Sequence, residues 1–438
     1  MNFTIDRQSL DELNLLGKFK QGSVYSLFNQ VKTRGGEQLL DQMFKHPLTD
    51  EQQINQRAAI FRFFQEADLQ WVFDPLQVAQ MHEYIDTSSS KNRISNYAGI
   101  LMKKTLSALT RDERYKSLIQ GMQATIMTLK KCLGIVELLH TMGGPFQYRN
   151  QEIRAIVHNG QLASLIETDI YSNISVRKIA VYDHLLKHTF NQEITSVLHF
   201  IAELDVNISI GQVADRHGLT WASALPKQAN TLQARNLRHP CINKAVGNEI
   251  GMQQQSNVIF LTGANMAGKS TWMKTIGISV YLAHIGFPVA ADWMEFSIRE
   301  GIYSSINVAD NIALGYSHFY AEVVRVNTAA DATCTGKHLL LMFDELFKGT
   351  NVKDAYDGTL AVTEAFSEYS NCLFIVSTHI IEVGEALKGR RNIQFKFMPT
   401  LLEGGMPKYT YRLKDGITED RQGMMIINNE GIIELIGT

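Results

Sequence analysis

The hydrophobic positions in the first half of the chain recur at helical spacing. Between residues 174 and 204, apolar side chains fall three, four or seven residues apart, which puts them on one face of a long helix. They are Ile179, Leu186, Phe190, Ile194, Val197, Ile201 and Leu204. Another helix is predicted over residues 111–140, and the capping-box pair Thr49 and Gln52 predicts one that ends near Phe64. Residues 1–225 are therefore predicted to form a helical domain, whose long helices fit either levers or a plain bundle.

The second half of the chain alternates between short apolar runs and helical patterns. A change in character falls at the polar residues 226–233. The predicted strands are residues 258–261, 338–343 and 373–377, and the predicted helices are residues 269–284, 317–333 and 357–369. Alternation of this kind is typical of a parallel sheet covered by helices. Residues 226–438 are therefore predicted to form an α/β domain.

A glycine-rich loop follows the first of these strands. Residues 262–271 read Thr-Gly-Ala-Asn-Met-Ala-Gly-Lys-Ser-Thr and fit the phosphate-loop pattern through Gly263, Gly268, Lys269 and Ser270. Between a strand and a helix, such a loop surrounds a phosphate with backbone N–H groups. Lys269 would bring positive charge to the outer phosphates, and Ser270 would offer a hydroxyl to Mg²⁺. The loop predicts a nucleoside triphosphate site, and the alternative is a chance match in an ordinary βα turn.

Two further strand ends carry groups suited to phosphate chemistry. The apolar run 339–343 ends in Asp344 and Glu345, where a phosphate-loop enzyme has its Mg²⁺-associated acid. Asp344 would hold the metal's water shell, and Glu345 would orient or deprotonate the attacking water. The third strand leads to His379, which could hydrogen-bond a γ-phosphate. Taken singly, these residues also fit an exposed acidic strand end and a structural histidine.

Charge and composition indicate where the protein is located but do not identify a ligand. The net charge is −2, so the whole chain has no signature of nucleic-acid binding. The four cysteines lie far apart, and the first residues lack a basic start that leads into an apolar core. No uncharged apolar run is long enough to span a bilayer. These features predict a cytoplasmic protein with no membrane partner.

One segment of the helical half is basic. Residues 91–116 contain seven Lys or Arg residues, and the acidic residues among them are Asp112 and Glu113. Positive charges clustered in this way can contact the phosphates of DNA. The residues predicted to do so are Lys91, Arg93, Lys103 and Lys104. A solvated helix face explains the same charges without a ligand.

Together, these motifs resemble those of the MutS family, the mismatch-repair ATPases. The loop 262–271 is similar to the family's T-G-x-N-M-x-G-K-S-T loop. Residues 309–319 resemble the segment that places a serine across a dimer interface. The other similar segments are Arg238-His239-Pro240, Asp344-Glu345 and Ser377-Thr378-His379 of the ATPase domain, and residues 22–36 and 202–206 at the start and end of the lever domain.

The resemblance implies an α-helical lever or core domain followed by an α/β P-loop ATPase domain of the ABC type, with ATP and Mg²⁺ as its ligands. Lys269, Glu345 and His379 would be the catalytic residues, with Glu345 as the base and His379 as the γ-phosphate sensor. Ser270 and Asp344 would hold Mg²⁺. In a homodimer, Ser317 would reach the nucleotide of the partner subunit. The other residues implied to bind ATP are Gly263, Ala264, Asn265, Met266, Ala267, Gly268, Thr271, Val246, Asn248 and Tyr411.

Parts of the family pattern are not found in the sequence. The lever-like sequence starts near residue 1, so a mismatch-recognition domain and a connector are expected to be missing, as are a clamp and a helix-turn-helix tail. The resemblance then predicts a truncated MutS-like ATPase that binds mismatched, branched or damaged DNA. The alternative is an ATP-gated module that binds an unidentified protein and never touches DNA. Nearly equal numbers of basic and acidic residues in 1–230 favour the module, whereas the basic segment 91–116 favours DNA.

Overall fold

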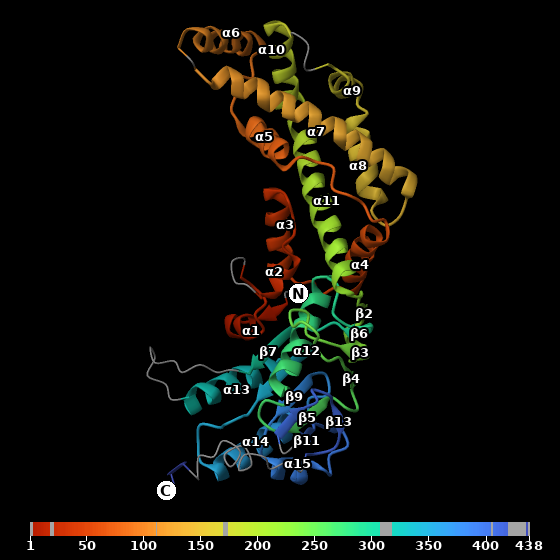
Figure 1. The fold of residues 1–438 in the computed structure, drawn as a ribbon, viewed down its shortest axis with the longest axis vertical. Helices are drawn as coiled ribbons and strands as arrows, with labels where there is room; N and C mark the ends of the chain where they lie inside the picture. Colours follow the sequence, from red (N-terminus) through yellow and green to blue (C-terminus); the bar gives the residue numbers. More distant parts are fainter. Residues whose placement is uncertain are drawn as a thin grey trace. The chain divides into compact units, whose positions relative to one another are not determined.

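The chain folds into two compact units. A computed structural model describes residues 3–17, 22–110, 112–169, 174–306, 318–403, 406–418 and 435–436. Unit 1 comprises Met1–Phe28, Phe44–Ala58 and Val213–Thr438, and unit 2 comprises Asn29–Met43 and Ala59–Gln212 (Figure 1). The division differs from a single cut near residue 226, because two segments from the start of the chain pack with the α/β part.

Unit 2 consists of helices. Two of them, α3 (Arg34–Lys45) and α4 (Glu51–Glu66), belong partly to unit 1, as does the end of α11. The others are α5 (Pro75–Asp86), α6 (Arg93–Thr110), α7 (Arg114–Met142), α8 (Gln147–Val157), α9 (Gly160–Ile166), α10 (Val176–His184), the π-helical turn η1 (Leu185–Thr189) and most of α11 (Asn191–His217).

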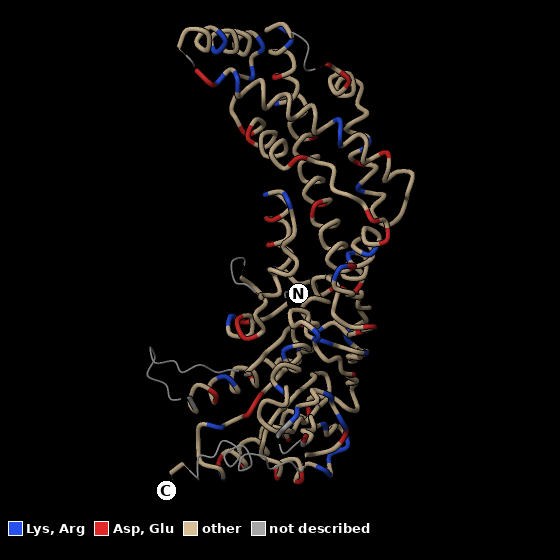
Figure 2. The backbone as a smooth tube through the Cα atoms, in the orientation of Figure 1, with Lys and Arg blue, Asp and Glu red and all other residues tan. Residues whose placement is uncertain are grey.

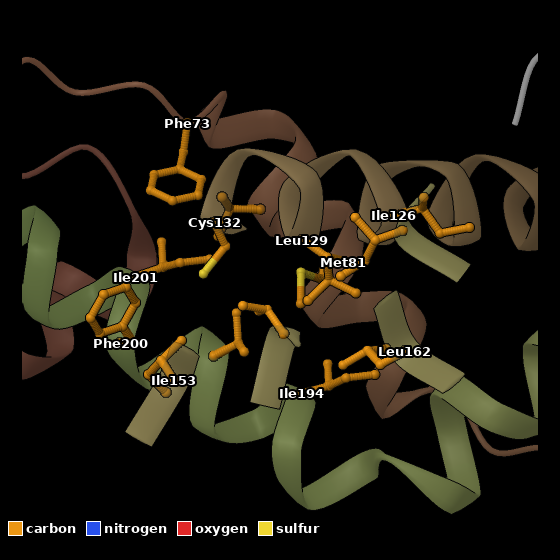
Figure 3. Close-up of a cluster of buried hydrophobic side chains, with 14 of the residues drawn as sticks. Phe73, Met81, Ile126, Leu129, Cys132, Ile153, Leu162, Ile194, Phe200 and Ile201 are labelled. Atoms are coloured by element: carbon orange, nitrogen blue, oxygen red, sulfur yellow. The ribbon is translucent and has the colours of Figure 1, made fainter. Parts of the chain in front are cut away.

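The core of unit 2 forms where α5, α7, α8, α9 and α11 meet. Figure 3 shows side chains from these helices pointing toward one another, among them Met81, Leu129, Ile153 and Ile194. All four are fully buried. By length and composition α11 could cross a membrane, but 72% of its most apolar window is buried within the protein. This is the burial expected of a central core helix.

The periodic segment 174–204 is not the single helix that its spacing predicts. Phe190 N donates to Leu185 O (2.8 Å), five residues back, so a π-helical turn separates α10 from α11. The predicted apolar face is nevertheless buried, from Ile179 in α10 to Leu204 in α11. The extra residue of the π-helical turn still leaves the apolar side chains three, four or seven residues apart. The spacing therefore did not reveal the break.

The helix predicted to begin at the Thr49 and Gln52 capping box begins one residue later. The first helical residue of α4 is Glu51, and Asp50 Oδ1 accepts a hydrogen bond from Gln53 N (2.9 Å). Asp50 is therefore the N-cap, a position for which Asp is as well suited as Thr.

A buried carboxylate joins two distant segments of unit 2. Asp205 of α11 accepts hydrogen bonds from the backbone N–H groups of Lys32 (3.0 Å) and Thr33 (2.7 Å) and from the Thr33 hydroxyl (2.7 Å). The α3 backbone passes so close that a Cβ on Gly36 would lie 2.5 Å from Asp205 Oδ2. The segments that resemble the start and end of a lever domain are thus in direct contact.

Unit 1 is built on a seven-stranded sheet. Its strands are, in spatial order, β1 (Thr4–Ile5), β7 (Gly301–Ser305), β8 (Leu339–Asp344), β9 (Leu373–Ser377), β5 (Val258–Gly263), β10 (Ile393–Met398) and β13 (Lys414–Asp415). All neighbours are parallel except β10 and β13. The central strands are buried along their length, as in a sheet covered on both faces. This confirms the α/β prediction for the second half.

The remaining elements of unit 1 surround this sheet. A second sheet has the order β2 (Ser223–Leu225), β6 (Trp293–Ser297), β3 (Leu232–Leu237) and β4 (Asn248–Met252), and β11 (Thr400–Glu403) pairs with β12 (Met406–Tyr409). The helices are α1 (Arg7–Glu12), α2 (Val24–Phe28), α12 (Lys269–His284), α13 (His318–Cys334), α14 (Val352–Ser367), α15 (Ile381–Leu387) and the 3₁₀ turn η2 (Lys227–Ala229).

Strand β1 and helix α1 attach the start of the chain to the sheet. Asp6 receives hydrogen bonds from the guanidinium of Arg325, and Glu12 Oε2 accepts from Ser304 Oγ (2.5 Å) and Ile306 N (3.0 Å). Burial alone would raise the pKa of Asp6, but the bonds from Arg325 and Ser9 outweigh it and hold this pKa below its usual value. No local pattern in the first residues predicts this attachment.

The close approach of α3 to α11 can be tested with two glycine substitutions. In Gly36→Ala the new methyl group would collide with Asp205, whereas Gly99 of α6 has open space around it. Both positions are helical and gain the same alanine propensity. We expect Gly36→Ala to be less stable than Gly99→Ala by about 1–3 kcal/mol, the usual cost of overpacking, in urea unfolding. Equal stabilities would show that the contact is looser than described.

Candidate nucleotide site

The register of three parallel strands assembles the candidate site. Leu261 of β5 pairs with Ser377 of β9, and Ser377 pairs with Asp344 of β8. The carboxyl ends of these strands therefore lie in one row. The loop after β5, the carboxylates after β8 and the histidine after β9 all leave the sheet at this edge, which is where ligands bind in open α/β sheets.

The glycine-rich loop turns sharply between β5 and α12. Gly263 has φ +144° and Gly268 has φ +104°, and Met266 also lies in the left-handed region at φ +67°. A Cβ on Gly263 would lie 3.0 Å from Met398 O of the neighbouring strand β10. Glycine is needed at Gly263 both for its backbone angle and for this close approach. The helix that follows begins at Lys269, as predicted.

Lys269 is held inside the loop. Its side chain is buried, and Nζ donates to the carbonyl oxygens of Gly263 (2.9 Å) and Ala264 (3.2 Å). Burial lowers the pKa of Lys269, and the charges of Asp344 and Glu345 oppose that shift. The ammonium group is thus positioned beside the loop, where a phosphate would provide it with a stronger partner.

Ser270 and Asp344 form the part of the site suited to a metal. The Ser270 hydroxyl donates to Asp344 Oδ2, while Asp344 Oδ1 is buried and has no hydrogen-bond partner among the described residues. Burial raises the pKa of Asp344, and the bond from Ser270 opposes this rise. A hydroxyl and a carboxylate are the hard oxygen ligands that Mg²⁺ prefers, so these residues fit that ion. Within the described ranges, no cluster of three His, Cys, Asp or Glu side chains could hold a metal.

Glu345 has an unusual backbone conformation. Its φ is +52°, in the left-handed region that non-glycine residues rarely adopt, and its N–H donates to Ser377 O (2.7 Å). The half-buried side chain lies 3.9 Å from His379 Nδ1 and 3.6 Å from Lys348 Nζ. The structure thus brings Glu345 and His379 together. Strain of this kind persists where surrounding contacts enforce it, often at active sites.

A cavity of about 640 Å³ opens beside the loop. Its walls include Lys269, Ser270 and Glu345. Val246, Asn248 and Tyr411, which the family resemblance implies to lie near the base, line it as well. Asn248 Nδ2 donates to Tyr411 O (2.9 Å), and Asn248 Oδ1 accepts from Leu413 N (2.7 Å). Asn248 therefore fixes the backbone around Tyr411.

The cavity also has walls that the sequence analysis did not assign. His239, Lys244 and Met398 line it. Burial, with a contribution from Lys274, lowers the pKa of His239 to about 4, so this imidazole is neutral at physiological pH. Met398 faces the loop because β10 pairs with β5, a neighbour relation that separation in sequence conceals. His239 belongs to the Arg238-His239-Pro240 motif, which was the available signal.

The other predicted site residues are distributed as follows. The loop residues Ala264, Asn265, Gly268 and Thr271 line the cavity, whereas Ala267 is buried. Ser317 lies outside the described residues.

The predicted DNA contacts all belong to unit 2. Lys91 precedes α6, and Arg93, Lys103 and Lys104 lie on it. Two other basic residues of the segment are paired, Arg114 with Asp112 (2.5 Å) and Lys116 with Glu113 (3.4 Å). Helix α6 itself contains no Asp or Glu, and Figure 2 shows only basic charges along it.

Comparison with known proteins agrees with this arrangement. A family model described as MutS domain III matches residues 8–210, and one described as MutS domain V matches residues 259–436. The boundaries correspond to the helical part and the α/β part of the chain.

Individual relatives are proteins named DNA mismatch repair protein MutS. That of Pseudothermotoga lettingae is 28% identical over 267 residues, which cover 59% of this chain and 32% of the relative. That of Petrotoga mobilis is 27% identical, covering 60% and 33%, and that of Lysinibacillus sphaericus is 27% identical, covering 66% and 34%. The chain spans about a third of the length of these relatives. With both domain models matched in order and the loop motif at the sheet edge, the chain belongs to the MutS family.

Proposed function

We propose that this protein is a Mg²⁺-dependent ATPase of the MutS type that couples ATP hydrolysis to DNA binding. The observation that carries the ATPase proposal is the convergence of Lys269, Ser270, Asp344 and Glu345 at one edge of the sheet. Phosphoryl transfer needs positioned charge more than covalent chemistry, and these groups supply it.

Each residue has a distinct part in the proposed reaction. Lys269 exchanges its two carbonyl partners for the outer phosphates of ATP. Ser270 and Asp344 hold Mg²⁺, which when bound neutralises charge on the phosphate oxygens. Glu345 accepts a proton from the attacking water, and His379, 3.9 Å from Glu345, hydrogen-bonds the terminal phosphate.

The cavity beside the loop can hold the adenosine part of ATP. Tyr411 lines the cavity and is 46% exposed, so its ring is accessible to a base. Val246 and the neighbouring Ile242 add apolar wall, and Asn248 holds the Tyr411 backbone in place. Asn265 lies on the phosphate side, where it would position water or phosphate.

DNA binding is the second half of the proposal. The relatives are named DNA mismatch repair proteins, and the charges of α6 are all basic. We propose that two subunits close on ATP, with Ser317 of each reaching the other's nucleotide, and that unit 2 contacts duplex DNA through Lys91, Arg93, Lys103 and Lys104. Mismatched, branched or damaged duplexes would be distinguished by shape and deformability. The free thiols of Cys132, Cys241, Cys334 and Cys372 agree with a cytoplasmic location.

A second candidate function is an ATP-gated module that binds a protein. The observation in its favour is the exposed apolar surface of α6, where Ile94, Met102 and Leu109 are each more than 60% exposed. Several exposed apolar side chains on one helix can contribute to a contact surface between proteins.

The ATPase assignment predicts different effects for two substitutions. Lys269→Ala should abolish ATP binding, because the phosphates lose their buried cation. Glu345→Gln should retain ATP binding but lower the hydrolysis rate by roughly 10²-fold or more, because the water loses its base. Phosphate release and fluorescent-ATP titration measure the two effects. Lys353→Ala, at an exposed position, is the control and should match the wild type. Unchanged turnover in either site variant would refute the assignment.

The shared-site proposal predicts ATP-dependent dimerisation. Glu345→Gln traps ATP, so in the presence of Mg²⁺ and ATP its mass by light scattering should rise from 49.4 kDa toward twice that value. Ser317→Arg added to this variant should block the closure by bulk and charge. If Glu345→Gln alone remains monomeric with ATP, the composite site does not form.

The DNA proposal predicts a salt-dependent loss on charge reversal. Lys103→Glu with Lys104→Glu should weaken duplex binding by about tenfold or more and reduce the salt dependence, since phosphate contacts are lost. The matched control is Lys130→Glu with Lys131→Glu, an adjacent pair on α7 of the same unit. ATP turnover should be unchanged in both. If no plain, mismatched or branched duplex binds even at low salt, the protein-binding module becomes the better account.

A further inference from the structure

Unit 2 contains a second large cavity, formed by three of its helices. It has a volume of about 1060 Å³ and is lined by residues of α6, α9, α10 and the first residue of η1. Small-ligand sites in proteins have volumes of roughly 300–1,000 Å³, so it can accept a ligand of that size. None of the residues already assigned to ATP lines it.

The lining of this cavity is cationic and aromatic. The positive charge comes from the guanidiniums of Arg93 and Arg177. The rings of Tyr97, Tyr182 and His184 line the same cavity, and burial lowers the pKa of His184, which favours its neutral form. Among the described residues that line the cavity, none carries a carboxylate. Arginine pairs well with phosphate, and tyrosine rings stack on planar bases.

Asp183, which directly precedes His184 of the cavity lining, points into the protein interior. Asp183 is fully buried and accepts hydrogen bonds from the Tyr84 hydroxyl (2.8 Å) and Asn96 Nδ2 (3.0 Å), and Lys187 Nζ lies 3.7 Å away. These bonds satisfy Asp183 without reducing the positive charge of the cavity wall. They also fasten α6 to α10, which Figure 1 shows side by side.

The buried network therefore fixes the two walls of the cavity. Asn96 lies between Arg93 and Tyr97 on α6, and Asp183 lies next to His184 on α10. A hydrogen bond between the Tyr182 hydroxyl and Thr168 Oγ1 (3.3 Å) also holds α10 in position. His184 Nδ1 is buried with no hydrogen-bond partner in the described part of the chain.

We infer that this cavity binds an unpaired nucleotide, with Arg93 and Arg177 on its phosphate and Tyr97 stacked on its base. The ligand is a phosphate ester that bears a planar ring, either free or at a single-stranded end of DNA. A base inside a duplex cannot enter, because its faces are covered by its neighbours. The inference deepens the DNA-binding proposal by naming the unpaired nucleotide as the feature that unit 2 recognises.

The test compares a fluorescent duplex that carries a short thymidine overhang with the same duplex made blunt. Mg²⁺ and ADP are kept in excess throughout, so that the ATP cavity is filled. We expect the whole chain to bind the overhang duplex more tightly. Tyr97→Ala and Arg177→Ala should each remove about tenfold of that preference, the usual scale for loss of a stacked base, and leave blunt-duplex binding unchanged. Lys104→Ala, which removes an α6 cation outside the cavity, should weaken both duplexes equally.

Competition with thymidine 5′-monophosphate separates the two sources of the ligand. Displacement of the overhang duplex by the free nucleotide would support a site for the nucleotide alone, and no displacement would support a site that also needs the adjoining strand. Equal affinity for the two duplexes, or a preference that survives in Tyr97→Ala and Arg177→Ala, would overturn the inference. Blunt-duplex binding tests the DNA proposal independently, so failure of one is distinguishable from failure of the other.

Discussion

The constraint on which the candidate ATP site depends is the register of a parallel sheet. Leu261, Ser377 and Asp344 lie in one row across β5, β9 and β8, although more than thirty residues separate each from the next along the chain. This alignment places the loop, the carboxylates and the histidine within reach of one ligand. A slip of one residue in β8 would turn Asp344 to the other face of the sheet and separate it from Ser270. The burial of these strands opposes such a slip, because every apolar side chain would have to repack on the opposite, equally buried face of the sheet.

Unit 2 depends on a different interaction. Its buried carboxylates accept hydrogen bonds from groups that are distant in sequence. Asp205 accepts hydrogen bonds from Lys32 and Thr33, and Asp183 does so from Tyr84 and Asn96. Removing one partner from such a group leaves the other buried and unpaired, which costs more than an ordinary hydrogen bond contributes. These two carboxylates therefore specify which helices meet, whereas the apolar core shown in Figure 3 supplies attraction without selecting partners as strictly.

Local patterns were sufficient to predict the helical and α/β halves, the glycine-rich loop and the position of Asp344 at the end of a strand. Helix α12 begins and ends at the predicted residues because the loop fixes its start. The attachment of β1 and α1 could not be predicted, because it depends on pairing between Thr4 and Gly301, far apart in sequence. The π-helical turn was concealed because its extra residue leaves the apolar face intact. Met398 was missed as a cavity wall because its proximity to the loop arises from tertiary folding, whereas His239 lies in the Arg238-His239-Pro240 motif, which carried a local signal.

The pairing of β1 with β7 has a consequence for the order of events during synthesis. Unit 1 is discontinuous in sequence. Its first strand, β1, pairs with β7, which is synthesised about 300 residues later. Domains fold as they emerge from the ribosome, so the continuous core of unit 2 can form first. Glu12 has no donor until Ser304 of β7 is made, and Asp6 lacks Arg325 until α13 follows. The sheet edge that β1 later covers is therefore completed only after most of the chain has been made, and an interrupted translation product would contain a folded unit 2 and an unpaired N-terminal strand.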